Sequence, residues 1–456
     1  MNKKLKYTNS LNIKDKKYVW HPYTQMKLWN SQQNNIITKG NNFSLVTDDN
    51  RKIIDGIASM WCNVWGYGKN PVISAMINQL KFLPNSTLFG LGNKTSIDLA
   101  ETLIKLTKGL DKVFYSDNGS TAIEVALKMS LQYWKNKGKI EKNKFVSLNH
   151  GYHGDTIAAM SIGYVPDFFD AYRTILFNPL KIKSPNEFEN ESGSDKEIME
   201  KSLENAEQIL KENSKELSAM IMESGAQIAG GLSIYPRGFQ KRISELCKKY
   251  DILLILDEIA TGFGRLGNLI EYAAQGSIPD IVCYGKALNG GYFPIAVTVT
   301  TNEVYNQFLG KYLDNKQFFH GHTYTGHPVG CAACVANIEL YKKTNLIKQI
   351  RENASYIKTR FPEIRKSKIV HKIRHKGLLL GVELIDNNKK PLNLIENKSL
   401  NHFVIRESIK RGVYLRGLDN IITVIPPLAI PRKELKKILD VQIDVLNSIE
   451  EKINVK

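Results

Sequence analysis

The middle of the chain alternates short apolar runs with longer amphipathic stretches, and this alternation limits the fold more than any other feature. The purest run, Ile252 to Leu256, holds five apolar residues in a row and is followed by Asp257. A continuous apolar run of this length is typical of a strand that is buried on both faces of a sheet. Strands that alternate with amphipathic helices predict a parallel sheet with helices on both sides.

We therefore expect an α/β fold in which a large, mainly parallel sheet, flanked by helices, occupies about residues 61–329. A smaller α+β domain is expected over residues 330–456, because a helical stretch to about residue 361 precedes two strand-like runs and a closing amphipathic helix. Residues 1–60 contain short strand-like pieces, and we expect this segment to pack with the smaller domain. The strands expected in the large sheet cover residues 113–117, 145–150, 219–224, 252–258, 280–286 and 296–301, and its helices include 121–134 and 241–250.

Length and composition exclude several classes of protein. A chain of 456 residues with 42% hydrophobic residues is too apolar to stay disordered and long enough for more than one domain. No run approaches the ~18 apolar residues that a membrane-spanning helix needs. The basic N-terminus precedes no apolar stretch and does not resemble a secretory signal, so we expect a cytoplasmic protein. The five scattered cysteines suit reduced thiols rather than a disulfide framework.

The charge balance raises the question of a polyanionic partner. Lys and Arg outnumber Asp and Glu by 63 to 45, a net charge of +18, and residues 351–377 are rich in basic side chains. Those side chains alternate with Ile and Val, and the sequence has no RNP, helix-turn-helix or zinc-finger pattern. We interpret the charge as a basic solvated surface and expect neither nucleic acid nor a membrane as a partner.

Polar residues gather where the expected strands end. Asp257 closes one apolar run, Lys286 closes the next, and residues 117–121 and 151–153 follow two others. In a doubly wound sheet, ligands bind beyond the carboxyl ends of the strands. These residues are therefore the candidates for a functional site.

The segment from Gly119 to Thr121 joins a strand to a helix whose first N–H groups can hold a phosphate. Gly119 permits a close approach, and Thr121 and Glu124 have the spacing of a capping box. An ordinary capped helix fits this segment equally well when the segment is taken alone.

Asp257 and Lys286 are the more informative pair. Pyridoxal phosphate needs a lysine for a Schiff base, an acid that keeps its pyridine nitrogen protonated, and a phosphate cradle. The consecutive strand ends supply all three. Two alternatives remain: the pair forms an internal salt bridge, or ILLILDE is the Walker B strand of an ATPase. The second alternative lacks the G-x-x-x-x-G-K-[ST] loop that such an ATPase needs.

Longer motifs around these residues carry a resemblance to a known family. The segments ILLILDEIATGFGRLG (252–267) and PDIVCYGKALNGGYFPIAV (279–297) are similar to the class III, fold-type I, pyridoxal phosphate-dependent aminotransferases. Within that family, further motifs resemble the 7,8-diaminopelargonic acid aminotransferases of biotin synthesis: VWHPYTQM (19–26), DGIASMWCNVWGYG (55–68), YSDNGSTAIEVALKMSLQYW (115–134), HGYHGDTIAAMSIG (150–163) and FFHGHTYTGHP (318–328). The resemblance runs from about residue 18 to 445 and implies the large and small domains of that fold.

The resemblance implies pyridoxal 5'-phosphate as the cofactor and matches its binding residues. Lys286 matches the lysine that binds the cofactor and moves the substrate proton, and Asp257 matches the partner of the pyridine nitrogen. Thr323 is expected to reach the phosphate of the neighbouring subunit, which implies a homodimer with shared active sites. The matched cofactor-binding residues are Gly119, Ser120, Tyr152, Asp257, Lys286 and Thr323.

The same resemblance implies a substrate pocket. Arg416 matches the arginine that receives the distant carboxylate of 8-amino-7-oxononanoate. This is physically sensible, because a long alkyl chain needs an apolar slot and its carboxylate needs a charged, bidentate end stop. Tyr23 matches an aromatic residue of the pocket and joins Lys286 and Asp257 in the catalytic set. The matched substrate-binding residues are Trp61, Tyr152, Gly321 and Arg416, with Arg265 and Asp155 as further members.

These matches imply a ping-pong aminotransferase that converts 8-amino-7-oxononanoate to 7,8-diaminononanoate while the cofactor alternates between its pyridoxal and pyridoxamine forms. S-adenosylmethionine is the usual amino donor of the family. Met60 and His322 depart from the residues that such members commonly carry, and a His at position 322 is similar to members that take lysine. Lysine as donor, or another class III transaminase for ω-amino acids or diamines, stays an alternative.

Three histidines, His320, His322 and His327, crowd one segment and raise the question of a metal. The resemblance assigns this segment to the cofactor phosphate, and transamination needs no metal. We therefore expect no metal site.

Overall fold

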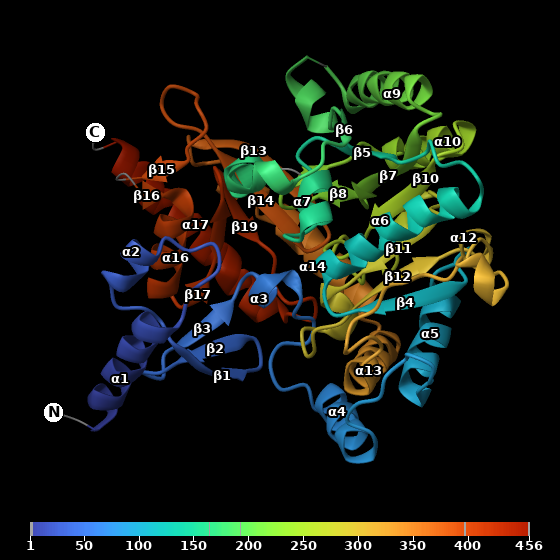
Figure 1. The fold of residues 1–456 in the computed structure, drawn as a ribbon. Coiled ribbons are helices and arrows are strands. Elements are labelled where there is room, and N and C mark those ends of the chain that lie inside the picture. Colours follow the sequence, from blue (N-terminus) through green and yellow to red (C-terminus); the bar gives the residue numbers. More distant parts are fainter. Residues whose placement is uncertain (1–2, 164, 192, 396–397, 455–456) are drawn as a thin grey trace.

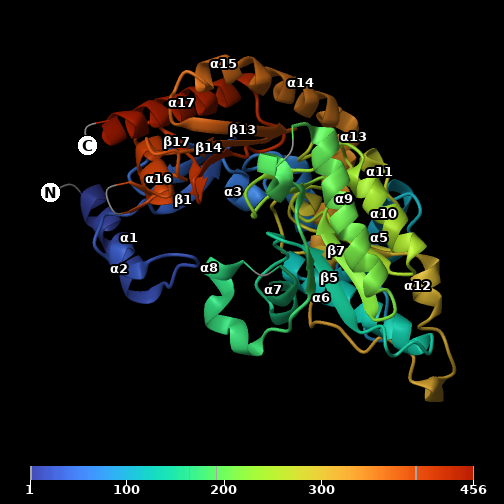
Figure 2. The same ribbon diagram turned by 90° about the horizontal axis from the view of Figure 1, so that it is seen from above.

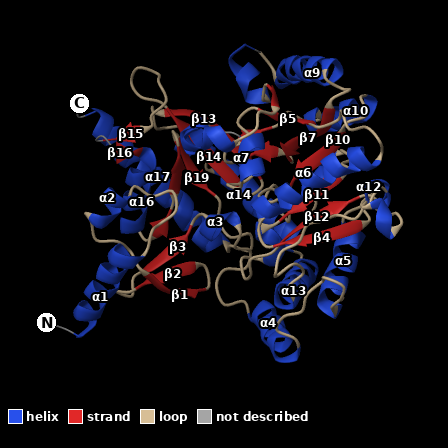
Figure 3. Cartoon of the chain, in the orientation of Figure 1, coloured by secondary structure: helices blue, strands red, loops and turns tan. Residues whose placement is uncertain are grey.

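The apolar runs in the middle of the chain form a seven-stranded sheet (Figures 1 and 3). The computed structural model describes residues 3–163, 165–191, 193–395 and 398–454. The strands are β4 (Lys112–Ser116), β5 (Lys144–Leu148), β6 (Leu180–Ile182), β7 (Leu217–Glu223), β10 (Leu253–Asp257), β11 (Ile281–Tyr284) and β12 (Ala296–Thr300). Their order is β4-β12-β11-β10-β7-β5-β6, and β12 runs antiparallel to both β11 and β4. The other neighbours pair in parallel, so all strands except β12 point the same way.

Helices cover both faces of this sheet. The helices of this part of the chain are α4 (Asn70–Phe82), α5 (Lys94–Leu106), α6 (Gly119–Asn136), α7 (Ile157–Gly163), α8 (Pro166–Phe169), α9 (Asp195–Glu212), α10 (Phe239–Lys249), α11 (Glu271–Gln275), α12 (Asn302–Asn306) and α13 (Pro328–Thr344). Leu253 and Ile255 of β10 share an apolar cluster with α6 and α7, whereas Leu254 and Leu256 share one with α5, α10 and α13. Successive side chains of a strand point to opposite faces. The unbroken apolar run of β10 therefore reflects burial on two sides.

The C-terminal part forms a second, antiparallel sheet. Its order is β13 (Val370–Lys376), β14 (Leu379–Leu384), β19 (Ile421–Val424) and β18 (Arg416–Leu418). The remaining helices of this part are α14 (Leu346–Thr359), α15 (Phe361–Ile364), α16 (Leu400–Lys410) and α17 (Arg432–Asn454), and a short ladder joins β15 (Leu394–Ile395) to β16 (Lys398–Ser399). Figure 2 shows α14, α15 and α17 along one outer side of this sheet.

The N-terminal strands join the C-terminal part of the chain. The strands β1 (Ile37–Asn41), β2 (Ser44–Thr47) and β3 (Lys52–Asp55) form an antiparallel meander, and β3 pairs in parallel with β17 (Val413–Tyr414). The N-terminal helices are α1 (Lys3–Tyr18), α2 (Met26–Asn30) and α3 (Ala58–Trp61). Figures 1 and 2 show α1 and α2 on the side of the molecule where α16 lies. Residues 54 and 413 are thus direct neighbours in one sheet.

Two sequence expectations about helices are wrong in detail. The single helical stretch expected from residue 330 to 361 is broken at Asn345, whose φ of 50° is left-handed and separates α13 from α14. Asn adopts this conformation more readily than most residues, so it can end one helix and start another. The helix expected from residue 121 begins two residues earlier, at Gly119.

No helix among the described residues combines the length and apolar character that crossing a bilayer demands.

Candidate active site

The carboxyl ends of five strands meet along one edge of the large sheet. Because β4 is antiparallel to β12, and β12 to β11, β4 ends on the same side as the parallel strands. This edge therefore carries residues 117–120, residues 151–153, Glu223, Asp257 and Lys286. The expectation that polar groups from consecutive strand ends share one edge is confirmed by this arrangement.

Asp257, the last residue of β10, is paired with a histidine. Its Oδ2 lies 2.8 Å from Nδ1 of His153, and the two side chains are only 5% and 1% exposed. Its Oδ1 accepts a hydrogen bond from the backbone N–H of Ile259 at 2.9 Å. No salt-bridge contact joins Asp257 to Lys286 among the described residues, so the alternative of an internal salt bridge between them is wrong. Both oxygens of this buried carboxyl group therefore have hydrogen-bond partners.

Lys286 follows β11 and starts a short 3-10 helix, Lys286–Asn289, with an unusual φ of 43°. Burial lowers the pKa of its ammonium, while the charges of Asp257 and Glu223 act in the opposite direction. Its Nζ lies 5.0 Å from the ring centre of Trp61. A lysine amine that is desolvated in this way is a better nucleophile and base near neutral pH than a surface lysine.

Glu223 ends β7 directly beside Asp257 in the parallel register. Its oxygens accept hydrogen bonds from the backbone N–H of Ile228 at 3.0 Å and of Tyr152 at 3.4 Å. Burial, followed by the charge of Asp257, raises the pKa of Glu223 to about 8. Burial therefore favours the protonated form of Glu223 near neutral pH.

The start of α6 forms a cradle next to these carboxylates. A Cβ on Gly119 would lie 2.9 Å from a methyl carbon of Ile259, and a Cβ on Gly154 would lie 2.0 Å from Oγ of Ser120. Only residues without side chains fit these two positions. The first N–H groups of the helix have no acceptor inside it, which makes the cradle suited to a phosphate.

The cap of this helix differs from the capping box expected at Thr121 and Glu124. Asn118 is the N-cap: its side chain accepts from the N–H of Thr121 at 3.1 Å, and Thr121 Oγ1 accepts from the N–H of Asn118 at 3.2 Å. Glu124 instead accepts from the N–H of Ala158 at 2.8 Å. Because Asn118 is held in this cap, Gly119 and Ser120 are left as the first residues of the helix.

Tyr23 and Tyr152 converge on one carboxylate. Their hydroxyls donate to the same oxygen, Oδ1 of Asp155, at 2.7 and 3.0 Å. Burial and the Asp155 charge raise the pKa of both phenols, so both stay protonated. The N–H of Asp155 in turn donates to Oγ of Ser120 at 3.2 Å, which links this cluster to the cradle.

Trp61 and Arg416 are connected through Met60. Nη1 of Arg416 donates to Sδ of Met60 at 3.5 Å, and Met60 precedes Trp61, whose ring faces Lys286. Arg416 has no carboxylate within salt-bridge distance among the described residues. The structure therefore brings Trp61, Lys286 and Arg416 to one region, although β18 belongs to the other sheet.

Gly321 and Thr323 lie on a loop beside the end of β4. Nδ1 of His322 is 3.0 Å from Oδ2 of Asp117, and Thr323 is exposed. A Cβ on Gly321 would lie 2.4 Å from the ring of Phe89, so this loop packs closely on that ring. The part of the chain that the structure describes holds no cluster of three or more His, Cys, Asp or Glu side chains suited to a metal.

Arg265 is fully buried between the two sheets. Its Nη1 donates to the carbonyls of Pro426 at 2.7 Å and Leu378 at 3.1 Å, whereas Nε and Nη2 have no partner among the described residues. Burial lowers the pKa of Arg265 to about 10, and its charge contributes to lowering the pKa of Lys286. Two unused donors on a buried cation favour an anionic ligand.

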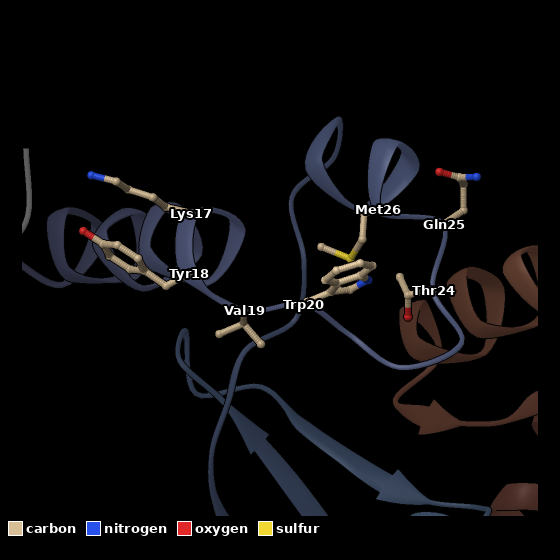
Figure 4. Close-up of a pocket in the computed structure, with 7 residues that line it drawn as sticks. All are labelled: Lys17, Tyr18, Val19, Trp20, Thr24, Gln25 and Met26. Carbon is tan, nitrogen blue, oxygen red and sulfur yellow. The ribbon is translucent and has the colours of Figure 1, made fainter. Parts of the chain in front are cut away.

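Two cavities flank this region without containing its charged centre. The larger, about 500 Å³, is formed by α1 and the segment before α2, where Trp20 and Met26 lie side by side (Figure 4). The smaller, about 220 Å³, includes Phe168, Asn186 and Arg374. The ring of Phe168 packs edge-on against that of Tyr23 at 5.3 Å between centres. None of the paired strand-end groups lines either cavity.

Sequence reasoning assigned no role in this region to three residues: His153, Glu223 and Met60. His153 was grouped with the strand-end residues, but its contact with Asp257 joins residues 104 apart and leaves no local pattern. The raised pKa of Glu223 depends on how β7 and β10 pair. Met60 was noted only as a departure from a family pattern. The signal that could have found Glu223 is its position at the end of an apolar strand.

Comparison with known proteins gives a consistent result over the whole chain. The profile of the family described as aminotransferase class-III matches residues 27–446. The adenosylmethionine-8-amino-7-oxononanoate aminotransferase of Staphylococcus aureus is 40% identical over 438 residues, which cover 95% of this chain and 96% of that protein. The enzyme of the same name from Aquifex aeolicus is 37% identical, with 96% and 97% covered.

Solved structures agree with these relatives. The crystal structure of the adenosylmethionine-8-amino-7-oxononanoate aminotransferase from Methanocaldococcus jannaschii superposes with a TM-score of 0.90 at 36% identity, covering 97% of this chain and 99% of that one. The omega transaminase from Pseudomonas jessenii in complex with PMP gives a TM-score of 0.92 at 28% identity, with the same coverage.

Proposed function

The chain belongs to the class-III aminotransferases, and on this basis we propose that it transfers an amino group to 8-amino-7-oxononanoate, giving 7,8-diaminononanoate for biotin synthesis. The observation that carries the choice of substrate is Arg416, a partly buried guanidinium whose side-chain partner is the thioether of Met60. A cation in this state suits the distal carboxylate of a long keto acid. The names of the relatives support the same substrate.

Class-III aminotransferases depend on pyridoxal phosphate, and the residues at the sheet edge fit it. Lys286 would attach it, Asp257 would meet its pyridine nitrogen, and the cradle at Gly119 and Ser120 would take its phosphate. Tyr152 would stack on its ring. When bound, the cofactor supplies an electron sink that stabilises negative charge at the substrate Cα.

The residues of this chain divide the remaining work. The Lys286 amine would take the proton from the substrate Cα as a general base, a role that the lowering of its pKa by burial favours. His153 holds the Asp257 carboxylate in one orientation through the 2.8 Å contact. Tyr23, placed by its hydrogen bond to Asp155, closes one side of the pocket as the third catalytic residue.

The substrate pocket is proposed to run from Lys286 to Arg416. The rings of Trp61 and Tyr152 would line its apolar part, and Gly321 would contribute from the partner subunit. The donor would bind in the first half of a ping-pong cycle and the keto acid in the second. Arg265, with two unused N–H donors beside this region, suits the carboxylate of an amino-acid donor.

The amino donor has two candidates. The names of the relatives favour S-adenosylmethionine. Met60 and His322 favour lysine, because they replace residues that are common in members using S-adenosylmethionine. Both donors are α-amino acids with a positive charge on the side chain, so the choice between them needs a measurement.

A homodimer with shared active sites is proposed from the loop that carries Thr323. Thr323 is exposed, as expected of a residue that reaches the cofactor phosphate of a neighbouring subunit. Phe82, Phe89, Tyr312 and Leu313 are each at least 65% exposed. A partner subunit would cover exposed apolar side chains of this kind.

The division into domains is proposed as residues 1–60 with the C-terminal sheet, 61–329 around the large sheet, and the remainder as the small domain. The pairing of β3 with β17 supports the first part of this division. Helix α13 contacts α4 and α5, which favours moving the second boundary towards Asn345.

A second function, a transaminase for ω-amino acids or diamines, is favoured by the close structural likeness to the omega transaminase. The two functions differ in their use of Arg416. For the proposed keto acid, Arg416→Ala should raise KM about 100-fold, since a charge-assisted pair worth up to ~3 kcal/mol is lost. For an acceptor without a distal carboxylate it should have little effect.

The test of the proposed function mixes cofactor-loaded protein with 8-amino-7-oxononanoate and either S-adenosylmethionine or lysine. Formation of 7,8-diaminononanoate is followed by mass spectrometry, and the change in cofactor absorbance with each donor alone identifies the donor. No product with either donor, while ω-amino acids convert the cofactor, would establish the second function instead.

A further inference from the structure

The guanidinium of Arg416 is held by a sulfur atom rather than by an acid. Nη1 donates to Sδ of Met60 at 3.5 Å, and no carboxylate lies within salt-bridge distance of Arg416 among the described residues. A thioether is a weak acceptor compared with a carboxylate. The contact can therefore orient the guanidinium and yet be exchanged for an anion at little cost.

The backbone around Met60 is fixed in a conformation that few residues adopt. Ala58, Ser59 and Trp61 have φ values of 50°, 61° and 65°. Asp55, which is fully buried, holds this segment by accepting the N–H of Ser59 at 2.6 Å. Strained segments persist where the surrounding structure over-determines them, often at ligand sites. The position of Met60 is thus built into the fold, although its side chain is 49% exposed.

We propose that Met60 is a positioning residue that determines specificity at the distal end of the pocket. Its thioether holds the Arg416 guanidinium towards the pocket while no carboxylate is present, and a substrate carboxylate displaces it. This inference rests on the proposed function, because it assumes that Arg416 receives the carboxylate of the substrate.

Preorganisation gives the expected size of the effect. Without the sulfur, Arg416 samples more rotamers, and a binding carboxylate must order it. Met60→Leu keeps an apolar side chain of similar volume and removes the acceptor. We expect its KM for 8-amino-7-oxononanoate to rise about three- to tenfold with kcat unchanged, since ordering one long side chain has about this effect on affinity.

Three comparisons separate this role from a merely structural one. The methyl ester of 8-amino-7-oxononanoate has the same chain without the charge, so its KM should differ by less than about twofold between wild type and Met60→Leu. Met60→Gln supplies a carbonyl acceptor and should restore the wild-type KM for the acid. Met60→Glu places a permanent carboxylate beside Arg416 and should raise that KM at least about 30-fold, because the two carboxylates compete.

A binding measurement without turnover makes the proposal independent of the reaction. Nonanoate and nonanamide are titrated into cofactor-loaded wild type, Met60→Leu and Met60→Glu by calorimetry. Nonanoate should bind wild type most tightly and Met60→Glu least, and nonanamide should not discriminate among the three.

The outcomes distinguish the two levels of inference. If 8-amino-7-oxononanoate is not turned over but nonanoate binding follows Met60, the proposed function fails and the role of Met60 stands. The inference is overturned if the keto acid is turned over and Met60→Leu changes KM equally for the acid and for its methyl ester. Met60 then only lines the substrate pocket.

Discussion

Nδ1 of His153 and Oδ2 of Asp257 lie 2.8 Å apart at the end of β10, with both side chains almost fully buried. At this distance the N–H of His153 donates a hydrogen bond to the carboxylate oxygen. The contact fixes the orientation of the carboxylate that is proposed to hold the cofactor ring, so His153 would act as a positioning residue.

Substitution of His153 should therefore reduce activity, and the loss should be larger when the substitute has no N–H donor. His153→Ala should lower kcat about 100-fold, because a small misplacement of a reacting group has effects of this size. His153→Asn keeps an N–H near the Nδ1 position and should lose about tenfold or less. Steady-state kinetics with a saturating cofactor concentration would measure both. Equal losses in the two variants would contradict a role in orienting Asp257.

Lys286 should be the site of covalent attachment. Borohydride reduction of the cofactor-loaded wild type should leave one cofactor on the peptide that contains residue 286, as detected by mass spectrometry. Lys286→Ala and Lys286→Arg should carry no adduct and lose at least about 10⁴-fold in activity, since they lack the nucleophilic amine. An adduct on another lysine in the wild type would refute the assignment.

Glu223 should make the stability of the apoprotein depend on pH. Its pKa is raised to about 8 in the folded chain, so the folded state holds a proton that the unfolded state releases above its ordinary pKa. Stability should consequently fall as pH rises from about 5 to 8, by up to ~1.4 kcal/mol per pH unit from this group. Thermal unfolding of wild type and Glu223→Gln would be compared across this range.

The neutral variant should lose part of that slope. Glu258, whose pKa burial also raises to about 8, keeps a similar dependence in both proteins and serves as the internal reference. If Glu223→Gln and wild type show the same slope between pH 5 and 8, Glu223 is ionised in the folded chain.

Shared active sites should allow two inactive chains to complement each other. Lys286→Ala removes the attachment lysine from its own site, and Thr323→Glu brings a negative charge to the phosphate of the partner's site. Neither variant should be active alone. Co-expressed chains that pair at random should recover about a quarter of wild-type activity, because half of the dimers are mixed and each has one intact site. No recovery in verified mixed dimers would argue against sharing.

The sequence predicted the parts of this molecule that local patterns determine. Apolar runs such as Ile252–Leu256 identified the strands, and the polar residues after them identified the edge where the site lies. Asp257 directly follows such a run, and Lys286 follows the next one after a single glycine. The chemistry proposed for them rests on residue type together with the resemblance to a known family.

The features that the sequence did not predict depend on long-range packing or lie in segments without a clear hydrophobic pattern. Helix α1 has a polar composition with little amphipathic pattern, and nothing in its sequence distinguishes it from a loop. The break at Asn345 arises because this one residue is left-handed instead of helical. The helical patterns on both sides of it give no sign of the change. The contact of Met60 with Arg416 spans 356 residues, which no spacing rule can reveal.

The hydrogen bonds of Arg265 depend on segments that are synthesised much later than Arg265 itself. Its two acceptors, the carbonyls of Leu378 and Pro426, lie 113 and 161 residues further along the chain. While the ribosome is still making that stretch, the guanidinium has no acceptor and must remain in water. The buried surroundings of this guanidinium are therefore complete only after Pro426 has emerged, and we expect the core around Arg265 to close late in synthesis.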